Sequence, residues 1–388
     1  MRIAFVLARY GRDVIGGAET LAKGLASAAV GRGWDVEVWT TCAVDYTTWA
    51  NQLPAGTVEE DGILIRRFLV DEWQAAPHHK LNQRLQSQRS LNTASEYDWV
   101  FSGPHSTALS SCVQKNAQSF DAIIIMPYIQ SITFDTVWLA GDNVVLLPCL
   151  HNELSAFMEP FRLLLESASG VIFISPEEAR FAMDELAVRL DRSAVIGAGI
   201  DNNLPLNIVP PNENSPYLLY VGRLDQGKNV KLLYDYVRRY AREGGNLKLL
   251  VAGDGPCKPP DSREFEYLGP VSDEKKNCLY RDSLALCQPS SNESFSLVIM
   301  ESWLALRPVL VWDGCDVTRG HVQRSKGGLW FGSYEEFKAA VEWLIKHEKA
   351  ANLMGLNGSR YVKENFSWDR VFDRFALTLN NWGFGEKG

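Results

Sequence analysis

Short, largely apolar runs recur along the chain, and each leads through a glycine or polar turn toward a further regular segment. Such runs occupy residues 3–7, 35–41, 62–68, 122–126, 144–147 and 170–175 in the first half, and residues 217–221, 247–252, 283–288 and 309–312 in the second. Short apolar runs of this kind are typical of parallel strands buried on both faces. Because parallel strands are joined by helical crossovers, the pattern predicts an α/β fold with parallel sheets.

One segment interrupts this alternation. Residues 205–216 are rich in proline and asparagine and show little periodicity, which is typical of a linker. A length of 388 residues is long for one domain and comfortable for two. We therefore predict an N-terminal domain over residues 1–203, a C-terminal domain over residues 204–367 and a terminal helix within residues 368–388.

The amino-acid composition of the chain argues against several classes of function. The net charge of −8 argues against a general nucleic-acid binder, which needs a basic face. The seven cysteines are scattered without a C-x-x-C pair or a histidine spacing typical of zinc, so we expect free thiols in a reducing cytoplasm and no metal site. The first residues read as a strand and not as a signal peptide, and no apolar stretch reaches the length of a membrane span.

Two glutamates eight residues apart mark the most informative stretch, residues 291–309. Glu293 lies in a polar loop, and Glu301 lies in the second turn of a helix that we expect to begin at Ser296. Ser296 is a candidate N-cap, since its hydroxyl can accept a hydrogen bond from a free backbone amide. A helix start attracts phosphate, and carboxylates beside that phosphate can hold sugar hydroxyls. Taken alone the pair is a weak signal, because many helices contain two glutamates at this spacing.

A second polar element follows the strand predicted at residues 217–221. It reads GRLDQGKN, in which Gly222 and Arg223 are followed five residues later by Lys228. Glycine allows a ligand to approach the backbone closely, and two cations can neutralise a diphosphate. The element therefore predicts an anion clamp, and a surface salt bridge is the alternative interpretation.

The N-terminal half carries two further signals after predicted strands. Gly16 and Gly17 precede a helix expected over about residues 18–31, where they indicate either close approach to a phosphate or a tight turn with positive φ. Their loop departs from G-x-G-x-x-G, which makes a nicotinamide cofactor a weak hypothesis. His151 follows the run 144–147, at the strand end where α/β proteins place ligand groups, and a structural role is an equal alternative.

Taken in order, these motifs resemble those of the retaining GT-B glycosyltransferases of family four, the glycogen-synthase-like group 1 glycosyltransferases. The match comprises the E-x7-E pair with Phe295, the GRLDQGKN run, the turn at Gly253 with Leu268-Gly269, the GGAE loop and His151. The resemblance implies two Rossmann-like domains facing across a cleft, the first on the acceptor side and the second binding the nucleotide-sugar donor. It also implies that the terminal helix packs back on the N-terminal domain.

The resemblance further implies roles for individual residues. Arg223 and Lys228 would hold the donor pyrophosphate, Glu293 the sugar hydroxyls and Glu301 the ribose, while His151 would contact the donor sugar. The expected catalytic residues are thus Glu293, Arg223, Lys228 and His151, without a metal, and the expected donor-binding residues are Gly16, Gly17, Gly222, Gly253, Leu268, Phe295, Ser296, Leu297 and Glu301.

The chain departs from the family pattern beside these motifs. Trp303, Leu304, Leu306 and Arg307 stand where the family usually has small residues and a glycine, and Ser296 stands where a glycine is usual. The carboxylates and the clamp are intact, so the departures concern the shape of the site around the donor sugar.

The activity that the resemblance implies is retaining, metal-independent transfer of a hexose to a hydroxyl of a saccharide or lipid-linked saccharide, in polysaccharide or glycolipid biosynthesis. UDP-glucose or a related UDP-hexose is the first choice of donor and GDP-mannose the second, and no cofactor is expected. A GT-B sugar-nucleotide epimerase and a non-catalytic nucleotide-sugar binding protein remain alternatives. We expect a cytoplasmic location, and peripheral attachment to the inner face of the membrane stays open.

Overall fold

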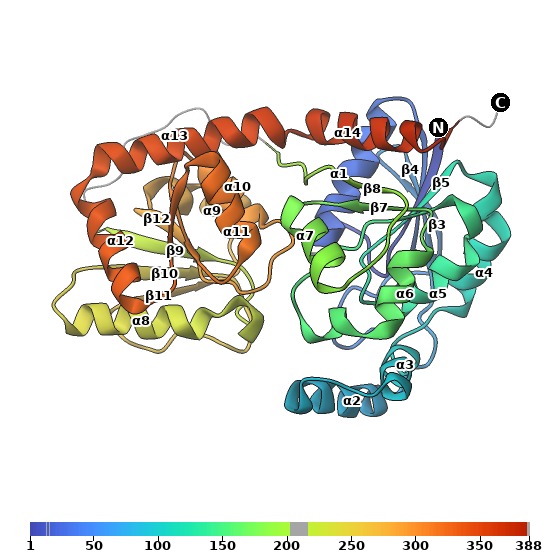
Figure 1. Cartoon of the computed structure of the whole chain (residues 1–388), viewed down its shortest axis with the longest axis horizontal. Coiled ribbons are helices and arrows are strands. Elements are labelled where there is room, and N and C mark those ends of the chain that lie inside the picture. Colours follow the sequence, from blue (N-terminus) through green and yellow to red (C-terminus); the bar gives the residue numbers. More distant parts are fainter. Residues whose placement is uncertain (13, 15, 202–215, 386–388) are drawn as a thin grey trace. The chain divides into compact units, whose positions relative to one another are not determined.

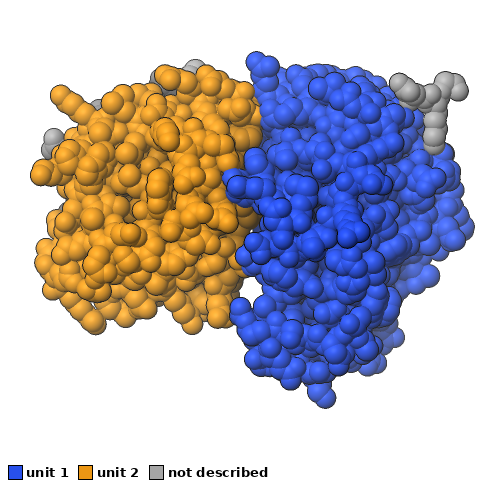
Figure 2. Space-filling view, in the orientation of Figure 1, with its two compact units in different colours: residues 1–199, 368–388 blue, residues 200–367 orange. Residues whose placement is uncertain are grey.

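The computed structural model describes all residues except 13, 15, 202–215 and 386–388 (Figure 1). It divides into two compact units, one formed by Met1–Gly199 with Trp368–Gly388 and the other by Ile200–Ser367 (Figure 2). Each unit has its own parallel sheet with helices around it, as Figure 1 shows. The α/β class with two parallel-sheet domains is therefore confirmed.

The sheet of the first unit has eight strands in the order β3-β4-β2-β1-β5-β6-β7-β8. They are β1 (Arg2–Val6), β2 (Asp35–Thr41), β3 (Gly56–Glu60), β4 (Ile63–Phe68), β5 (Ala122–Ile125), β6 (Val144–Leu146), β7 (Gly170–Phe173) and β8 (Ser193–Val195). All neighbours pair in parallel except β3 and β4, which form an antiparallel edge. The sequence pattern missed β3 because its residues, GTVEE, are polar and largely exposed.

Helices cover this sheet, and the last helix of the chain belongs to the same unit. They are α1 (Gly17–Gly31), α2 (Ala75–Gln88), α3 (Thr93–Phe101), α4 (Thr107–Asn116), α5 (Ser131–Leu139), α6 (Glu159–Ser167), α7 (Pro176–Arg180) and α14 (Trp368–Asn381). Helix α14 packs beside α1, where a Cβ atom at Gly24 would lie 1.9 Å from the Trp368 ring. Gly24 therefore makes room for the indole that anchors α14.

The sheet of the second unit is parallel throughout, in the order β11-β10-β9-β12-β13-β14. Its strands are β9 (Tyr217–Val221), β10 (Lys248–Ala252), β11 (Phe265–Gly269), β12 (Ala285–Gln288), β13 (Val309–Trp312) and β14 (Gly328–Phe331). The chain builds outward from β9 in one direction as far as β11, and then returns to the other side of β9 with β12. Ligands of open α/β sheets bind outside the carboxyl ends of strands at such a reversal.

The helices of the second unit are α8 (Val230–Arg242), α9 (Asp273–Asp282), α10 (Leu297–Leu304), α11 (Asp316–Ser325), α12 (Tyr334–Lys346) and α13 (Glu348–Asn365). The sequence predicts a loop-rich region over residues 314–328, and that prediction is wrong, because α11 lies there. Polar His321 and Thr318 occupy buried positions of α11 beside Val317 and Val322. Their polarity conceals the apolar face that would have indicated a helix.

Trp303 fits into the second unit because two glycines face it. A Cβ atom at Gly358 on α13 would lie 2.1 Å from the Trp303 ring, and the indole nitrogen donates to the backbone oxygen of Gly327 over 2.7 Å. The large Trp303 side chain, which departs from the family pattern, is thus buried against α13. Across the described residues, no helix combines the length and apolar character needed to cross a membrane.

Candidate active site

Backbone hydrogen bonds tie the carboxyl ends of β9, β10 and β11 together. Gly222 N donates to Ala252 O over 3.0 Å, and Gly253 N donates to Gly269 O over 2.9 Å. Gly253 has a φ of 134°, and a Cβ atom there would lie 1.9 Å from the carbonyl oxygen of Gly222. Only glycine allows this close approach, so Gly222 and Gly253 shape the floor of the site.

The loop after β9 presents the two predicted cations in different environments. Asp225 organises the loop, since its carboxylate accepts from the Lys228 backbone amide over 3.0 Å and lies 3.5 Å from the Arg223 guanidinium. The Arg223 side chain is 59% exposed, whereas that of Lys228 is 16% exposed. Arg223 is therefore accessible from solvent, and Lys228 is held inside the site.

Lys228 and Glu293 meet at the carboxyl ends of β9 and β12. Lys228 Nζ lies 2.7 Å from Glu293 Oε1, which also accepts from Gln288 Nε2 over 3.0 Å. The Glu293 side chain is only 9% exposed, so this is not a surface salt bridge. A cation and a carboxylate thus lie side by side where the strand order reverses. Such a cation can bind a phosphate, and such a carboxylate can accept hydrogen bonds from sugar hydroxyls.

Two buried polar atoms near Glu293 lack a hydrogen-bond partner among the described residues. They are Gln288 Oε1 and Ser296 Oγ. Ser296 is the N-cap residue of α10, as predicted. The expectation that its hydroxyl accepts a capping hydrogen bond is wrong. Its φ of 74° is left-handed, and the hydroxyl accepts no cap hydrogen bond. A bound ligand would supply the partners that both atoms lack.

Replacing Ser296 by glycine is expected to stabilise the fold by about 1 kcal/mol. Glycine adopts a left-handed φ without strain, and the change also removes a buried hydroxyl without a partner. Thermal unfolding should show an increase in Tm of about 2–4 °C. Ser333→Gly is the matched control, because the Ser333 hydroxyl does cap α12 by accepting from Glu336 N over 3.2 Å. A lower Tm for Ser296→Gly would contradict this account.

Glu301 is held by two side chains of α9. Lys276 Nζ donates to Glu301 Oε1 over 2.9 Å, and the Tyr280 hydroxyl donates to Oε2 over 2.8 Å. Burial raises the pKa of Tyr280 well above its ordinary value, and the negative charge of Glu301 adds to the shift. Tyr280 therefore remains a hydrogen-bond donor at any physiological pH.

The other predicted donor-binding residues of this unit differ in accessibility. Leu268 at the end of β11 and Leu297 at the start of α10 are half-buried. Phe295 is 3% exposed, and its ring packs against those of His321 and Phe366, with centroids 5.0 and 4.9 Å away. Its side chain therefore supports the loop from beneath.

Gly16 and Gly17 lie at the start of α1 in the first unit, and neither has a positive φ in the left-handed range. The tight-turn hypothesis is therefore wrong. A Cβ atom at Gly16 would lie 2.0 Å from Glu19 Oε2, whereas one at Gly17 would meet nothing within 4 Å. Gly16 thus makes room for the carboxylate of Glu19, which forms a buried ion pair with Arg9.

His151 lies five residues beyond β6 in the first unit, and its Nδ1 is 3.9 Å from Glu153 Oε1. The backbone just before it is anchored by Glu178, which is buried. Glu178 accepts from Leu150 N over 2.6 Å and from Ile174 N over 2.7 Å, which joins the loops after β6 and β7. Burial raises the pKa of Glu178 to about 8, while these amide hydrogen bonds act in the opposite direction.

Removing the Glu178 side chain is expected to destabilise the fold. In Glu178→Ala two buried backbone N–H groups lose their acceptor, and we expect a loss of about 2 kcal/mol in the free energy of unfolding. Denaturant unfolding measures it. Glu159→Ala is the control, because Glu159 is an exposed carboxylate paired with Arg162 on α6, and it should change stability by less than about 1 kcal/mol. Equal stability of both variants would contradict an anchoring role.

The structure gathers most of the predicted residues in the second unit. Gly222, Arg223, Lys228, Gly253, Leu268, Glu293, Phe295, Ser296, Leu297 and Glu301 all belong to it, and Gly16, Gly17 and His151 belong to the first. Sequence reasoning missed Gln288, Lys276, Tyr280 and Glu178. The signal for two of them is the spacing of Lys276 and Tyr280, which are four residues apart and so lie on the same face of α9.

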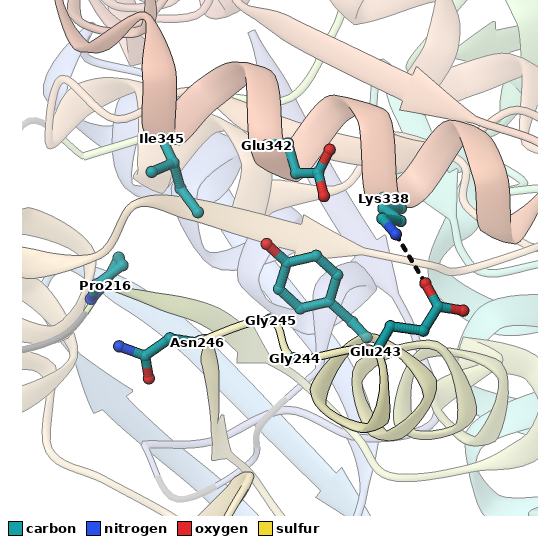
Figure 3. Close-up of a pocket in the computed structure, with 9 residues that line it drawn as sticks. Pro216, Glu243, Gly244, Gly245, Asn246, Lys338, Glu342 and Ile345 are labelled. Atoms are coloured by element: carbon teal, nitrogen blue, oxygen red, sulfur yellow. Dashed lines mark hydrogen bonds and ion pairs between the residues drawn. The ribbon is translucent and has the colours of Figure 1, made fainter.

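A separate cavity of about 470 Å³ lies away from these residues, at the amino ends of β9 and β10 (Figure 3). It is lined by Pro216, Tyr240, Glu243, Gly244, Gly245, Asn246, Lys338, Glu342 and Ile345. Lys338 Nζ pairs with Glu243 Oε2 over 2.8 Å at its edge. Because the clamp lies at the carboxyl ends, this cavity is not part of the candidate site.

Comparison with known proteins agrees with the geometry. Residues 206–361 match the family model described as glycosyl transferases group 1. An uncharacterised glycosyltransferase of Methanocaldococcus jannaschii is 23% identical over 404 residues, covering 96% of both chains. Sucrose-phosphate synthase from Thermosynechococcus elongatus superposes with a TM-score of 0.72 at 16% identity, covering 98% of both chains. The Anabaena HepE protein in complex with UDP-glucose gives 0.70 at 17% identity, covering 98% of this chain and 100% of that chain.

The fold is thus that of the GT-B proteins, and most of the predicted site residues lie in the second unit. Residues 206–361 thus resemble the group 1 glycosyltransferases, the family that the motifs indicated.

Proposed function

We propose that the protein is a retaining glycosyltransferase that moves a hexose from a nucleotide diphosphate sugar to a hydroxyl of a saccharide or lipid-linked saccharide. The observation that carries this proposal is the 2.7 Å contact between Lys228 Nζ and Glu293 Oε1 at the sheet reversal. It places a phosphate-binding cation beside a carboxylate that can accept from sugar hydroxyls.

The proposed donor is a UDP-hexose, with GDP-mannose as the second choice. The HepE structure, which contains UDP-glucose, supports the first choice through its similarity in fold. In this proposal the second unit binds the donor, and His151 is a candidate catalytic residue of the first unit.

Catalysis would rest on stabilising the leaving nucleotide. The bond between the anomeric carbon and the β-phosphate oxygen breaks, which leaves positive charge on the sugar and negative charge on the diphosphate. Arg223, Lys228 and the amides of Ser296 and Leu297 would stabilise the diphosphate without a metal ion. The acceptor hydroxyl would enter on the face that the nucleotide leaves, so that the anomeric configuration is retained.

Donor binding would also rearrange the Lys228–Glu293 pair. When phosphate takes over the Lys228 ammonium, Glu293 keeps its hydrogen bond from Gln288 and gains the capacity to accept from sugar hydroxyls. The sugar would thus be oriented by a carboxylate that the donor itself has released.

Product analysis tests this proposal. The protein is incubated with UDP-glucose or GDP-mannose, alone and with free hexoses, hexose phosphates and lipid-linked saccharides, and the products are assigned by NMR. We expect an acceptor-dependent glycoside with the anomeric configuration of the donor. A changed sugar nucleotide formed without acceptor would instead identify an epimerase. Donor binding without any turnover would identify a non-catalytic binding protein.

A further inference from the structure

We propose that Lys276 and Tyr280 are positioning residues that orient Glu301 toward the ribose of the donor, so that the site selects ribonucleotides over 2′-deoxyribonucleotides. This inference rests on the proposed function. It deepens that function by assigning the recognition of the nucleotide sugar to two α9 residues outside the E-x7-E pair.

Both oxygens of Glu301 are fixed by different donors. Oε1 accepts from Lys276 Nζ over 2.9 Å, and Oε2 accepts from the Tyr280 hydroxyl over 2.8 Å. Two contacts to two oxygens define the plane of the carboxylate, whereas a single contact would leave it free to rotate. Tyr280 is fully buried, so its hydroxyl is itself held in place by packing.

The fixed carboxylate keeps capacity for a ligand. A carboxylate offers about four lone-pair directions, and Lys276 and Tyr280 occupy one on each oxygen. The Glu301 side chain remains 24% exposed, so the other directions are accessible from solvent. Two neighbouring hydroxyls, such as the 2′ and 3′ hydroxyls of a ribose, can donate one to each oxygen.

Helix α9 also connects this carboxylate to the end of β11, where the predicted donor-binding residue Leu268 lies. The helix begins at Asp273, four residues after the last residue of β11, and Ser272 caps it by accepting from Lys275 N over 3.3 Å. Lys276 and Tyr280 are four residues apart, so they follow one another on the face turned to α10. One helix therefore carries both side chains that hold Glu301.

Lys276 is suited to this role by its charge. Partial burial lowers its pKa, but the charges and hydrogen bonds of Glu301 and Asp273 together outweigh burial, so the pKa is raised overall. Its second partner, Asp273, lies 3.1 Å away and has a side chain that is 91% exposed, whereas the Glu301 side chain is 24% exposed. The charged ammonium thus has Glu301 as its less exposed partner.

Nucleotide binding measured by calorimetry tests the inference. We would compare UDP with 2′-deoxy-UDP and GDP with 2′-deoxy-GDP, because the base is not assigned. The wild type should bind the ribonucleotide at least about tenfold more tightly. In Tyr280→Phe and in Lys276→Met this ratio should fall to about threefold or less, through weaker binding of the ribonucleotide alone.

Tyr217→Phe is the matched control. The Tyr217 hydroxyl donates to the backbone oxygen of Leu279 on α9 over 2.8 Å but does not contact Glu301. Tyr217→Phe should lower the stability of the fold without changing the ratio of ribonucleotide to deoxyribonucleotide affinity. The inference would be overturned if Tyr280→Phe kept the wild-type ratio of ribonucleotide to deoxyribonucleotide affinity. It would also be overturned if this ratio fell equally in Tyr217→Phe. If the wild type binds none of these nucleotides, the proposed function itself fails, a result distinct from binding without ribose selectivity.

Discussion

Replacing Lys228 by alanine is expected to reduce the rate of sugar transfer at least about a hundredfold, because the departing diphosphate loses a preorganised cation. Lys228 is the clamp cation held inside the site, with its side chain 16% exposed. Arg223, which is 59% exposed, cannot substitute for it in the same position. Steady-state kinetics with saturating acceptor measure the effect on kcat and on kcat/KM.

Lys231→Ala is the matched control for this prediction. Lys231 is the next lysine along the chain, lies on α8 and is exposed. Its replacement should leave the rate within about twofold, since an exposed charge outside the site contributes little. Near-normal turnover in Lys228→Ala, with the fold intact by circular dichroism, would remove Lys228 from the clamp.

The largest expected effect on stability concerns the same ion pair. In Lys228→Met the Glu293 carboxylate, 9% exposed, loses its countercharge, and we expect the free energy of unfolding to fall by about 3 kcal/mol. In the double variant Lys228→Met/Glu293→Gln no charge remains unpaired. Most of the lost stability should therefore return, while transfer activity remains absent. Denaturant unfolding of the wild type, both single variants and the double variant gives the coupling energy.

An exposed ion pair in the same unit provides a reference double-mutant cycle. Arg239 and Glu335 approach to 3.0 Å with side chains 53% and 72% exposed, so their coupling energy should stay below about 1 kcal/mol. If the Lys228–Glu293 cycle gives a value equally small, the pair is not the buried element of the site that the account requires. Recovery of activity in the double variant would contradict the proposed roles of both residues.

Much of the fold could be predicted from the sequence because its strands are apolar and short. The predicted strands at residues 217–221 and 309–312 coincide with β9 and β13, and the helix expected over about residues 18–31 corresponds to α1. Polar elements were missed. Strand β3 is an exposed edge, and α11 turns His321 and Thr318 inward, so neither carries the periodicity on which prediction depends.

Positions in the site could be predicted better than side-chain interactions. Motif spacing places Lys228 and Glu293 on the loops after β9 and β12, but it does not show that they pair, or that Gln288 shares the carboxylate. These contacts depend on which strands are neighbours. The backbone at Ser296 could not be predicted either, since a non-glycine residue rarely adopts a left-handed φ.

The central claim is that the second unit binds a nucleotide diphosphate sugar through Lys228. Calorimetry without metal, using UDP-glucose, UDP-N-acetylglucosamine, GDP-mannose and the free diphosphates, tests it most directly on the wild type and Lys228→Ala. We expect the wild type to bind one of these donors and its free diphosphate, and both to bind at least about tenfold more weakly to the variant. Absence of binding to any nucleotide, or equal binding by both proteins, would contradict it.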